Sequence, residues 1–320
     1  MPVLNSEYCP PFIFQNGHLS TIYAAVFRHV KNPGQQRERL ELEDGDFLDL
    51  DWTYAKDSRK RVVILLHGLE GDTQRPYMLG SARVLSEAGF DVCAVNMRGC
   101  SGVPNRLYRS YHSGATEDLM SVLNHLENTR DYQQVFLKGF SLGANLILKY
   151  LGDHSEAPER ITAAVAVSAP CDLHDCLLQL SMSKNRIYAN RFLVSLREKL
   201  KIKQAHFPEL LSDEMIKQVR TLKDFDDIYT SKAHGFRDAM DYYRNCSSLP
   251  VLSAISVPTL LLNAKNDSFL GENCYPDQEG QSNSALFFEP PNFGGHVGFY
   301  LRGNLYYNES RTLDFFGNYS

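Results

Sequence analysis

The sequence predicts an α/β fold in which a mostly parallel central sheet has helices on both faces. From residue 61 onward, short apolar stretches alternate with helical stretches, as the crossover connections of a parallel sheet require. The stretch RVVILLHG at 61–68 is almost continuously apolar, which is typical of a strand buried on both faces. The chain has 320 residues, 43% of them hydrophobic, so it can form a sizeable core.

The segment before the first parallel strand is expected to be less regular. Residues 1–35 contain several prolines and lack clean periodicity, so we interpret them as an N-terminal arm packed on the core, with a short helix within HLSTIYAAVFR. The following segment, RERLELEDGDFLDLDWTY at 37–54, alternates between apolar and polar residues on both sides of an Asp-Gly pair. This pattern predicts a β-hairpin.

The other core elements are expected in alternation. Helices are predicted at about 76–88, 114–128 and 142–152, with Gly89 ending the first and Gly152 the last. The further strands are predicted at 90–99, 134–139, 161–170, 257–264 and 285–290.

A long helical insert interrupts this alternation. Residues 172–250 contain no convincing apolar strand and are longer than one crossover connection requires. We therefore interpret 172–250 as a lid or cap, and 36–171 with 251–320 as the core. The alternative is one crossover helix with surface decoration. The basic stretch RFLVSLREKLKIK at 191–203 is interpreted as a solvated helix face, rather than a membrane-surface or acidic-ligand site.

Composition limits the possible partners. A net charge of −5 argues against nucleic acid, which binds basic surfaces. The start of the chain does not resemble a signal peptide, and the longest aliphatic run, VVILL at 62–66, is too short to span a bilayer. We expect a soluble, cytoplasmic protein.

Its seven cysteines are scattered, and CDLHDC at 171–176 lacks a second ligand pair, so no metal or cofactor is predicted. The oligomeric state is not indicated.

The stretch GFSLG at 139–143 stands between a predicted strand and a predicted helix. A strand, Gly-x-Ser-x-Gly and a helix in this order form a nucleophile elbow, whose strained turn lifts the serine hydroxyl above the sheet. The glycines leave room for backbone that passes close to the turn. We therefore predict that Ser141 is a nucleophile, although the pattern alone also fits a simple glycine turn.

A serine nucleophile needs a base, and in this architecture the acid and then the histidine follow it along the chain. Asp267 follows one apolar strand and His296 follows the next, so both are expected at the carboxyl edge of the sheet. We predict His296 as the base and Asp267 as its orienting acid. The alternative acids are Asp172 and Asp175. The histidines considered structural are His125, His154, His206 and His234.

The oxyanion formed during acyl transfer needs two hydrogen-bond donors. One is expected to be the backbone N–H of Leu142, which follows the nucleophile. The other is expected from HGLEG at 67–71, after the first parallel strand, and the position of Leu69 nominates its N–H. We expect His67 to shape this loop and to have no role as a base.

Four further stretches carry a family resemblance: NGHLSTIYAAVFR (16–28), LLHGLEGD (65–72), NMRGCSG with YHSGATEDL (96–119) and GFSLGANLILKYLG (139–152). With NDSFL and GGHVGF, they make the chain resemble the α/β-hydrolase superfamily, and within it the YheT-like group. The resemblance implies the α/β-hydrolase fold and serine-dependent chemistry on carboxylic esters. It also implies that Ser141, Asp267 and His296 form the triad. No role is predicted for His18, Tyr111 or His112.

The predicted function is a serine esterase or lipase that acts through an acyl-enzyme on short to medium acyl esters, lipid-like esters among them. An acyltransferase using an alcohol acceptor is the alternative within the same chemistry, and a non-catalytic binding protein is the alternative from another class. Several apolar residues of the insert are expected either to line an acyl tunnel or to pack the lid on the core: Phe192, Leu193, Leu196, Phe207, Phe225 and Phe236.

Overall fold

One sheet of eight strands organises the chain, in the order β1-β2-β4-β3-β5-β6-β7-β8. The computed structural model describes residues 3–154, 161–277 and 283–320. The strands β3 to β8 run parallel to one another, whereas β2 pairs antiparallel with both β1 and β4. The strands are β1 (Gln36–Glu41), β2 (Phe47–Thr53), β3 (Arg61–Leu66), β4 (Asp91–Asn96), β5 (Gln134–Phe140), β6 (Ile161–Val167), β7 (Thr259–Leu262) and β8 (Leu286–Glu289). The predicted mostly parallel sheet and hairpin are therefore confirmed.

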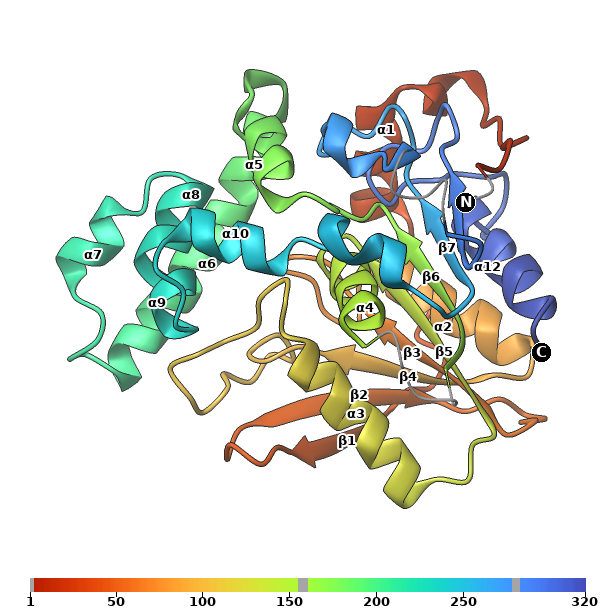
Figure 1. Ribbon diagram of the computed structural model, residues 1–320, viewed down its shortest axis with the longest axis horizontal. Coiled ribbons are helices and arrows are strands. Elements are labelled where there is room, and N and C mark those ends of the chain that lie inside the picture. The colour runs from red at the N-terminus through yellow and green to blue at the C-terminus, as the bar shows by residue number, and fades with distance from the viewer. Residues whose placement is uncertain (1–2, 155–160, 278–282) are drawn as a thin grey trace.

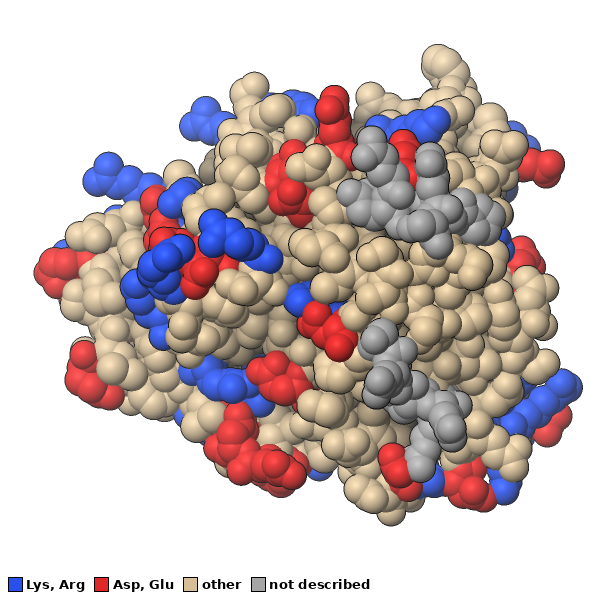
Figure 2. Space-filling model, viewed as in Figure 1, with Lys and Arg blue, Asp and Glu red and all other residues tan. Residues whose placement is uncertain are grey.

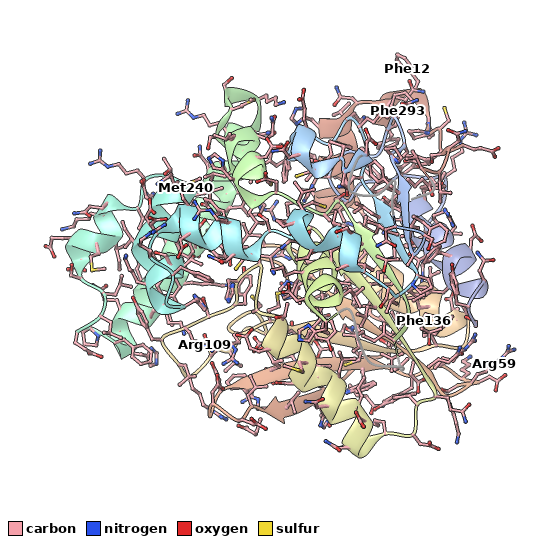
Figure 3. All side chains as sticks on the ribbon, viewed as in Figure 1. Phe12, Arg59, Arg109, Phe136, Met240 and Phe293 are labelled. Carbon is pink, nitrogen blue, oxygen red and sulfur yellow. The ribbon has the colours of Figure 1, made fainter. Side chains whose placement is uncertain are left out.

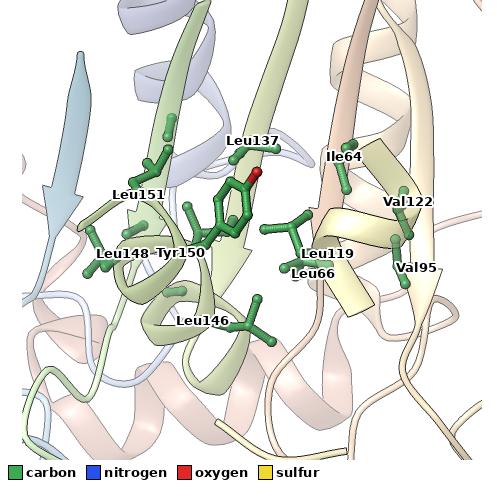
Figure 4. Close-up of a cluster of buried hydrophobic side chains, with 14 of the residues drawn as sticks. Ile64, Leu66, Val95, Leu119, Val122, Leu137, Leu146, Leu148, Tyr150 and Leu151 are labelled. Atoms are coloured by element: carbon green, nitrogen blue, oxygen red, sulfur yellow. The ribbon is translucent and has the colours of Figure 1, made fainter. Parts of the chain in front are cut away.

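Helices cover both faces of the sheet (Figure 1). The core helices are α2 (Pro76–Glu87), α3 (Thr116–Thr129), α4 (Leu142–Asp153) and α12 (Tyr307–Gly317). Alternate residues of β3 enter different cores: Ile64 packs with residues of α3 and α4, and Leu65 packs with residues of α2 and α12. Figure 4 shows the first of these clusters, where Leu119 and Leu146 lie over the strands. A strand buried on both faces explains the continuous apolar run that the sequence shows.

The prediction that Gly152 ends α4 is wrong, because the helix continues to Asp153. The glycine instead allows close packing. A Cβ atom at Gly152 would lie 2.5 Å from the carbonyl oxygen of Val251, in the short helix η5 (Leu249–Ala254). The sequence pattern suggested that Gly152 is there to end the helix. The glycine is instead required by the close approach of Val251, about a hundred residues further along the chain.

Residues 172–250 are helical and project from one end of the sheet (Figure 1). They form a small apolar cluster of their own, which includes Leu193, Leu200 and Val219. Their elements are α5 (Leu173–Ser181), η3 (Ser183–Asn185), α6 (Arg186–His206), α7 (Asp213–Gln218), α8 (Leu222–Phe225), η4 (Asp226–Thr230), α9 (Ser231–Ala233), α10 (Ala239–Cys246) and the start of η5. Below we refer to residues 172–250 as the lid segment; its role as a lid stays a prediction.

The N-terminal arm contains η1 (Phe12–Gln15), α1 (Gly17–Ile22) and η2 (Tyr23–Phe27). The side chain of Asn16 caps α1 by accepting from the N–H of Leu19 at 3.0 Å. Phe12 is 88% exposed and points away from the molecule, whereas Phe136 of β5 lies in the interior (Figure 3). The arm is nevertheless tied to the other end of the chain, because Arg28 and Glu309 form a buried ion pair.

The surface carries charges of both signs. Figure 2 shows Lys and Arg side chains over the lid segment, with Asp and Glu side chains among them, and no unbroken basic area on this face. Among the described residues, no helix combines the length and apolar character needed to cross a bilayer. The mixed charge agrees with the small net charge of the sequence.

Candidate active site

Ser141 occupies the sharp turn between β5 and α4. Its φ of 51° and ψ of −119° are strained for a residue with a side chain. The N–H of Ser141 donates to the carbonyl of Val167, in the neighbouring strand, at 2.9 Å. The flanking glycines are required by contact: a Cβ atom at Gly139 would lie 2.4 Å from the carbonyl oxygen of Gly143. One at Gly143 would lie 2.6 Å from the carbonyl oxygen of His67.

The structure brings the three predicted residues Ser141, His296 and Asp267 together. The Ser141 Oγ and the His296 Nε2 are 2.9 Å apart, and the His296 Nδ1 lies 2.8 Å from the Asp267 Oδ2. A neutral imidazole that donates from Nδ1 to the carboxylate has Nε2 free to accept the serine proton. The Asp267 side chain is fully buried, and its second oxygen accepts from the N–H of Phe269 at 2.9 Å.

The alternative acids lie elsewhere. Asp172 caps α5 by accepting from the N–H of Asp175 at 3.0 Å, and Asp175 accepts from the N–H of Asn273 at 2.9 Å. The histidines considered structural bond to groups outside this site: His125 to Glu38, His154 to Tyr150, His206 to Ile202, and His234 to Thr230 and Ser110.

The loop that carries His296 is held by residues that sequence reasoning missed. The ring of Phe269 stacks on the imidazole with centroids 4.2 Å apart. From the arm, the Thr21 Oγ1 accepts from the N–H of His296 at 2.8 Å. A Cβ atom at Gly295 would lie 2.3 Å from the carbonyl oxygen of Gly17, so α1 lies directly against this loop. The motif NGHLST includes Thr21, so the sequence marked this segment as part of a motif. It did not indicate that the segment contacts the His296 loop.

The two predicted oxyanion donors lie beside the serine. Leu142 is the first residue of α4, so its N–H has no acceptor within the helix, and the helix end contributes partial positive charge. Leu69 follows Gly68, where a Cβ atom would lie 3.1 Å from the Cβ of Ser141. Ser141, Leu142 and Leu69 all line one cavity. Their role as oxyanion donors stays a prediction.

His67 stabilises the loop after β3 through both ring nitrogens. Nδ1 lies 2.8 Å from the carbonyl oxygen of Gly68, and Nε2 accepts from the N–H of Met97 at 3.1 Å. The ring is fully buried, and this desolvation lowers the pKa of His67 to about 4. A neutral imidazole with both nitrogens in use fits the structural role expected for this residue.

Because His67 is buried, we expect the free energy of unfolding to depend on pH. Between pH 6.5 and about 4 the unfolded chain binds a proton at His67 that the folded protein does not, so stability is lost as the pH falls. We expect the drop in unfolding free energy from pH 6.5 to 5 to be about 2 kcal/mol larger in the wild type than in His67→Gln. Urea unfolding at both pH values measures it. The control is the exposed His29→Gln, and equal drops in all three proteins would contradict the assignment.

The cavity at Ser141 has a volume of about 310 Å³ and lies between the core and the lid segment. Of the apolar residues named above, Phe192, Leu196 and Phe225 line it. The others pack elsewhere: Leu193 within the cluster of the lid segment, Phe207 against Tyr108 and Phe236 against His112. Three of these residues therefore line the cavity, Phe207 and Phe236 contact the core, and an acyl tunnel stays a prediction.

The interpretation of 191–203 as a solvated face is wrong for two of its lysines. Lys203 is 7% exposed, and its Nζ donates to the Asn105 Oδ1 at 2.6 Å. Lys199 donates to Glu70 at 2.8 Å. Both lysines line the cavity because they face the core from α6. Helical spacing alone did not reveal which face of α6 is covered.

The three residues without a predicted role also contact the lid segment. The His18 Nδ1 lies 3.1 Å from the hydroxyl oxygen of Tyr188, so it links the arm to α6. The Tyr111 hydroxyl bonds to Glu70, and the Lys199 Nζ lies 5.1 Å from the centre of the Tyr111 ring. The rings of His112 and His234 are tilted to each other, with centroids 4.4 Å apart. These contacts account for their positions in the fold.

Comparison with known proteins places this chain in a family. Residues 61–302 match the family described as alpha/beta hydrolase fold. The chain is 36% identical to the putative esterase YheT of Escherichia coli, over 98% of this chain and 94% of that protein. It is 28% identical to the human phospholipase ABHD3, over 93% of this chain and 75% of that protein. The chain therefore belongs to the α/β-hydrolase family, and within it to the group that includes YheT.

A solved structure shows the same fold. The esterase PF2001 of Pyrococcus furiosus aligns with a TM-score of 0.60 over 89% of this chain and 91% of that chain, at 17% sequence identity. The predicted α/β-hydrolase fold is thus confirmed at the level of the backbone.

Proposed function

We propose that this enzyme, a carboxylic ester hydrolase of the esterase and lipase class, acts through a covalent acyl-enzyme on Ser141. The observation that carries the proposal is the chain of hydrogen bonds from Ser141 through His296 to Asp267. Ser141, at one end of this chain, lines a cavity. Three such groups at the carboxyl edge of a sheet are the arrangement that activates a serine hydroxyl. Similarity to YheT, a putative esterase, and to ABHD3, a phospholipase, supports the same reaction class.

In the first step the Ser141 Oγ attacks the ester carbonyl carbon while its proton passes to the His296 Nε2. Asp267 keeps the imidazole in the required tautomer and stabilises the imidazolium. The N–H groups of Leu142 and Leu69 bind the resulting oxyanion. The C–O bond then breaks, and His296 returns its proton to the departing alkoxide. Water repeats these steps on the acyl-enzyme and releases the carboxylic acid.

The cavity supports substrates with short to medium acyl chains. Its volume of about 310 Å³ lies at the low end of the range for small-molecule sites. Apolar side chains such as Leu177, Leu196 and Phe192 give it walls that suit an acyl chain. Because Lys199 and Lys203 of α6 line the cavity beside these apolar side chains, we propose a lipid-like ester, which has both an apolar and a polar part, as the natural type of substrate.

A chain-length series tests the proposal. Wild-type protein is expected to hydrolyse p-nitrophenyl esters with the highest kcat/KM for acyl chains of short to medium length, because longer chains exceed the cavity. A fluorophosphonate should add its mass to the peptide that contains Ser141. Repeating the series with an added alcohol measures ester formation: a new ester that dominates over free acid would favour the acyltransferase. Absence of both turnover and labelling would contradict the proposal and favour a binding protein.

A further inference from the structure

Glu70 stands next to Leu69 in the loop after β3, and it is buried. The residue is 9% exposed, and its φ of 53° lies in the left-handed region, where a residue with a side chain is strained. Such a conformation persists only where the surroundings hold it. The contacts of Glu70 therefore bear directly on the geometry of the neighbouring oxyanion donor.

Two residues of the core hold the main chain of Glu70. The hydroxyl group of Tyr111 accepts from the N–H of Glu70 at 2.8 Å and also donates to the Glu70 Oε1 at 2.8 Å. Arg75 donates to the carbonyl oxygen of Glu70 at 2.8 Å. The N–H of Glu70 belongs to the peptide unit that adjoins Leu69, so fixing this unit restricts the backbone rotation of Leu69.

The carboxylate of Glu70 is bound at the same time by the lid segment. Lys199 donates to Oε1 at 2.8 Å, and the hydroxyl of Ser195 donates to Oε2. These two residues lie four positions apart on α6, so they present neighbouring side chains on one helix face. The Glu70 side chain is only 4% exposed in this ion pair, and at such burial the loss of one partner is costly.

We infer that Glu70 is a positioning residue that couples the seating of α6 to the orientation of the Leu69 N–H. With α6 in place, Lys199 and Ser195 hold the Glu70 carboxylate in one position. Tyr111 binds both this carboxylate and the Glu70 N–H, so the main chain is held as well and the Leu69 N–H points at the oxyanion. With α6 displaced, the carboxylate loses both lid contacts and the strained conformation of Glu70 is released. The inference rests on the proposed function, since it assigns Leu69 a part in binding the oxyanion.

The test variants are Glu70→Gln and Lys199→Met. Their matched controls are Glu198→Gln and Lys201→Met, which change exposed side chains of α6. For a p-nitrophenyl ester, kcat should fall about tenfold to a hundredfold in both test variants, because one oxyanion donor is misaimed. KM should stay nearly unchanged. Binding of a trifluoromethyl ketone, which forms a tetrahedral oxyanion adduct, should weaken in proportion to kcat. The combined variant should lose little more than either single one, because both changes break the same coupling.

Other outcomes would overturn the inference. A rise in KM alone, additive losses, or equal losses in the two controls would indicate that these residues only attach the lid segment. Hydrogen exchange gives a readout that needs no substrate: amides of residues 67–72 should exchange faster in Glu70→Gln and Lys199→Met than in the wild type. Unchanged exchange would overturn the coupling. An inactive, unlabelled wild type with faster exchange in the variants would instead contradict the proposed function alone.

Discussion

Replacing Ser141 by alanine is expected to lower kcat/KM for p-nitrophenyl esters by about 10⁴-fold or more, because no acyl-enzyme can form. The remaining rate would come from binding and from the oxyanion donors. Alanine tolerates the φ of 51° about as well as serine does, and the N–H bond from residue 141 to Val167 is unaffected. The fold should therefore persist, with a melting temperature within a few degrees of that of the wild type.

The control for this variant is Ser121→Ala, which removes a serine hydroxyl of α3 that donates to the carbonyl oxygen of Glu117 in its own helix. It should keep the full activity. If Ser141→Ala retained more than a tenth of the wild-type rate while folded, another nucleophile would have to be sought. The measurement is initial rates of p-nitrophenol release, with circular dichroism to verify folding.

Gly143→Ala is expected to destabilise the fold strongly. Its Cβ would lie 2.6 Å from the carbonyl oxygen of His67 and 2.7 Å from that of Leu66, and backbone at the end of a central strand cannot give way. We expect a loss of about 3 kcal/mol or more in the free energy of unfolding, measured with urea. Activity should fall as well, because α4 must shift and take Leu142 with it.

Gly317→Ala is the matched control, because among the described residues no atom outside its chain neighbours and its own helix backbone lies within 4 Å of the Cβ that it would add at the end of α12. Alanine is the better helix former, so this variant should be as stable as the wild type or slightly more stable. Equal stability of Gly143→Ala and Gly317→Ala would show that the turn at Ser141 does not require close approach of the backbone.

Local patterns in the sequence predicted much of the fold and the three hydrogen-bonded residues. A buried strand such as 61–66 is recognisable because both of its faces are apolar, and the elbow is recognisable because its glycines and serine are adjacent. Asp267 and His296 followed from the chain order of acid and histidine, together with their positions after two apolar strands. Each of these signals lies within a few residues of the element that it predicts.

The contacts that support the site could not be predicted, because they join distant segments. Nothing near Lys199 in the sequence indicates Glu70 as its partner, 129 residues away. The same holds for Thr21, whose hydroxyl oxygen accepts a hydrogen bond from the N–H of His296. Periodicity places a side chain on a helix face, but only packing decides which face is covered.

The contact between Thr21 and the His296 loop spans 275 residues of the chain and has a consequence for how the protein is made. The arm leaves the ribosome before the histidine loop, because His296 lies 275 residues further along the chain than Thr21. A nascent chain that ends after α4 already has Ser141, yet it lacks Asp267, His296 and the loop that the arm supports. Under the proposed mechanism, ester cleavage therefore becomes possible only after residue 296 has been synthesised and its loop has met the arm.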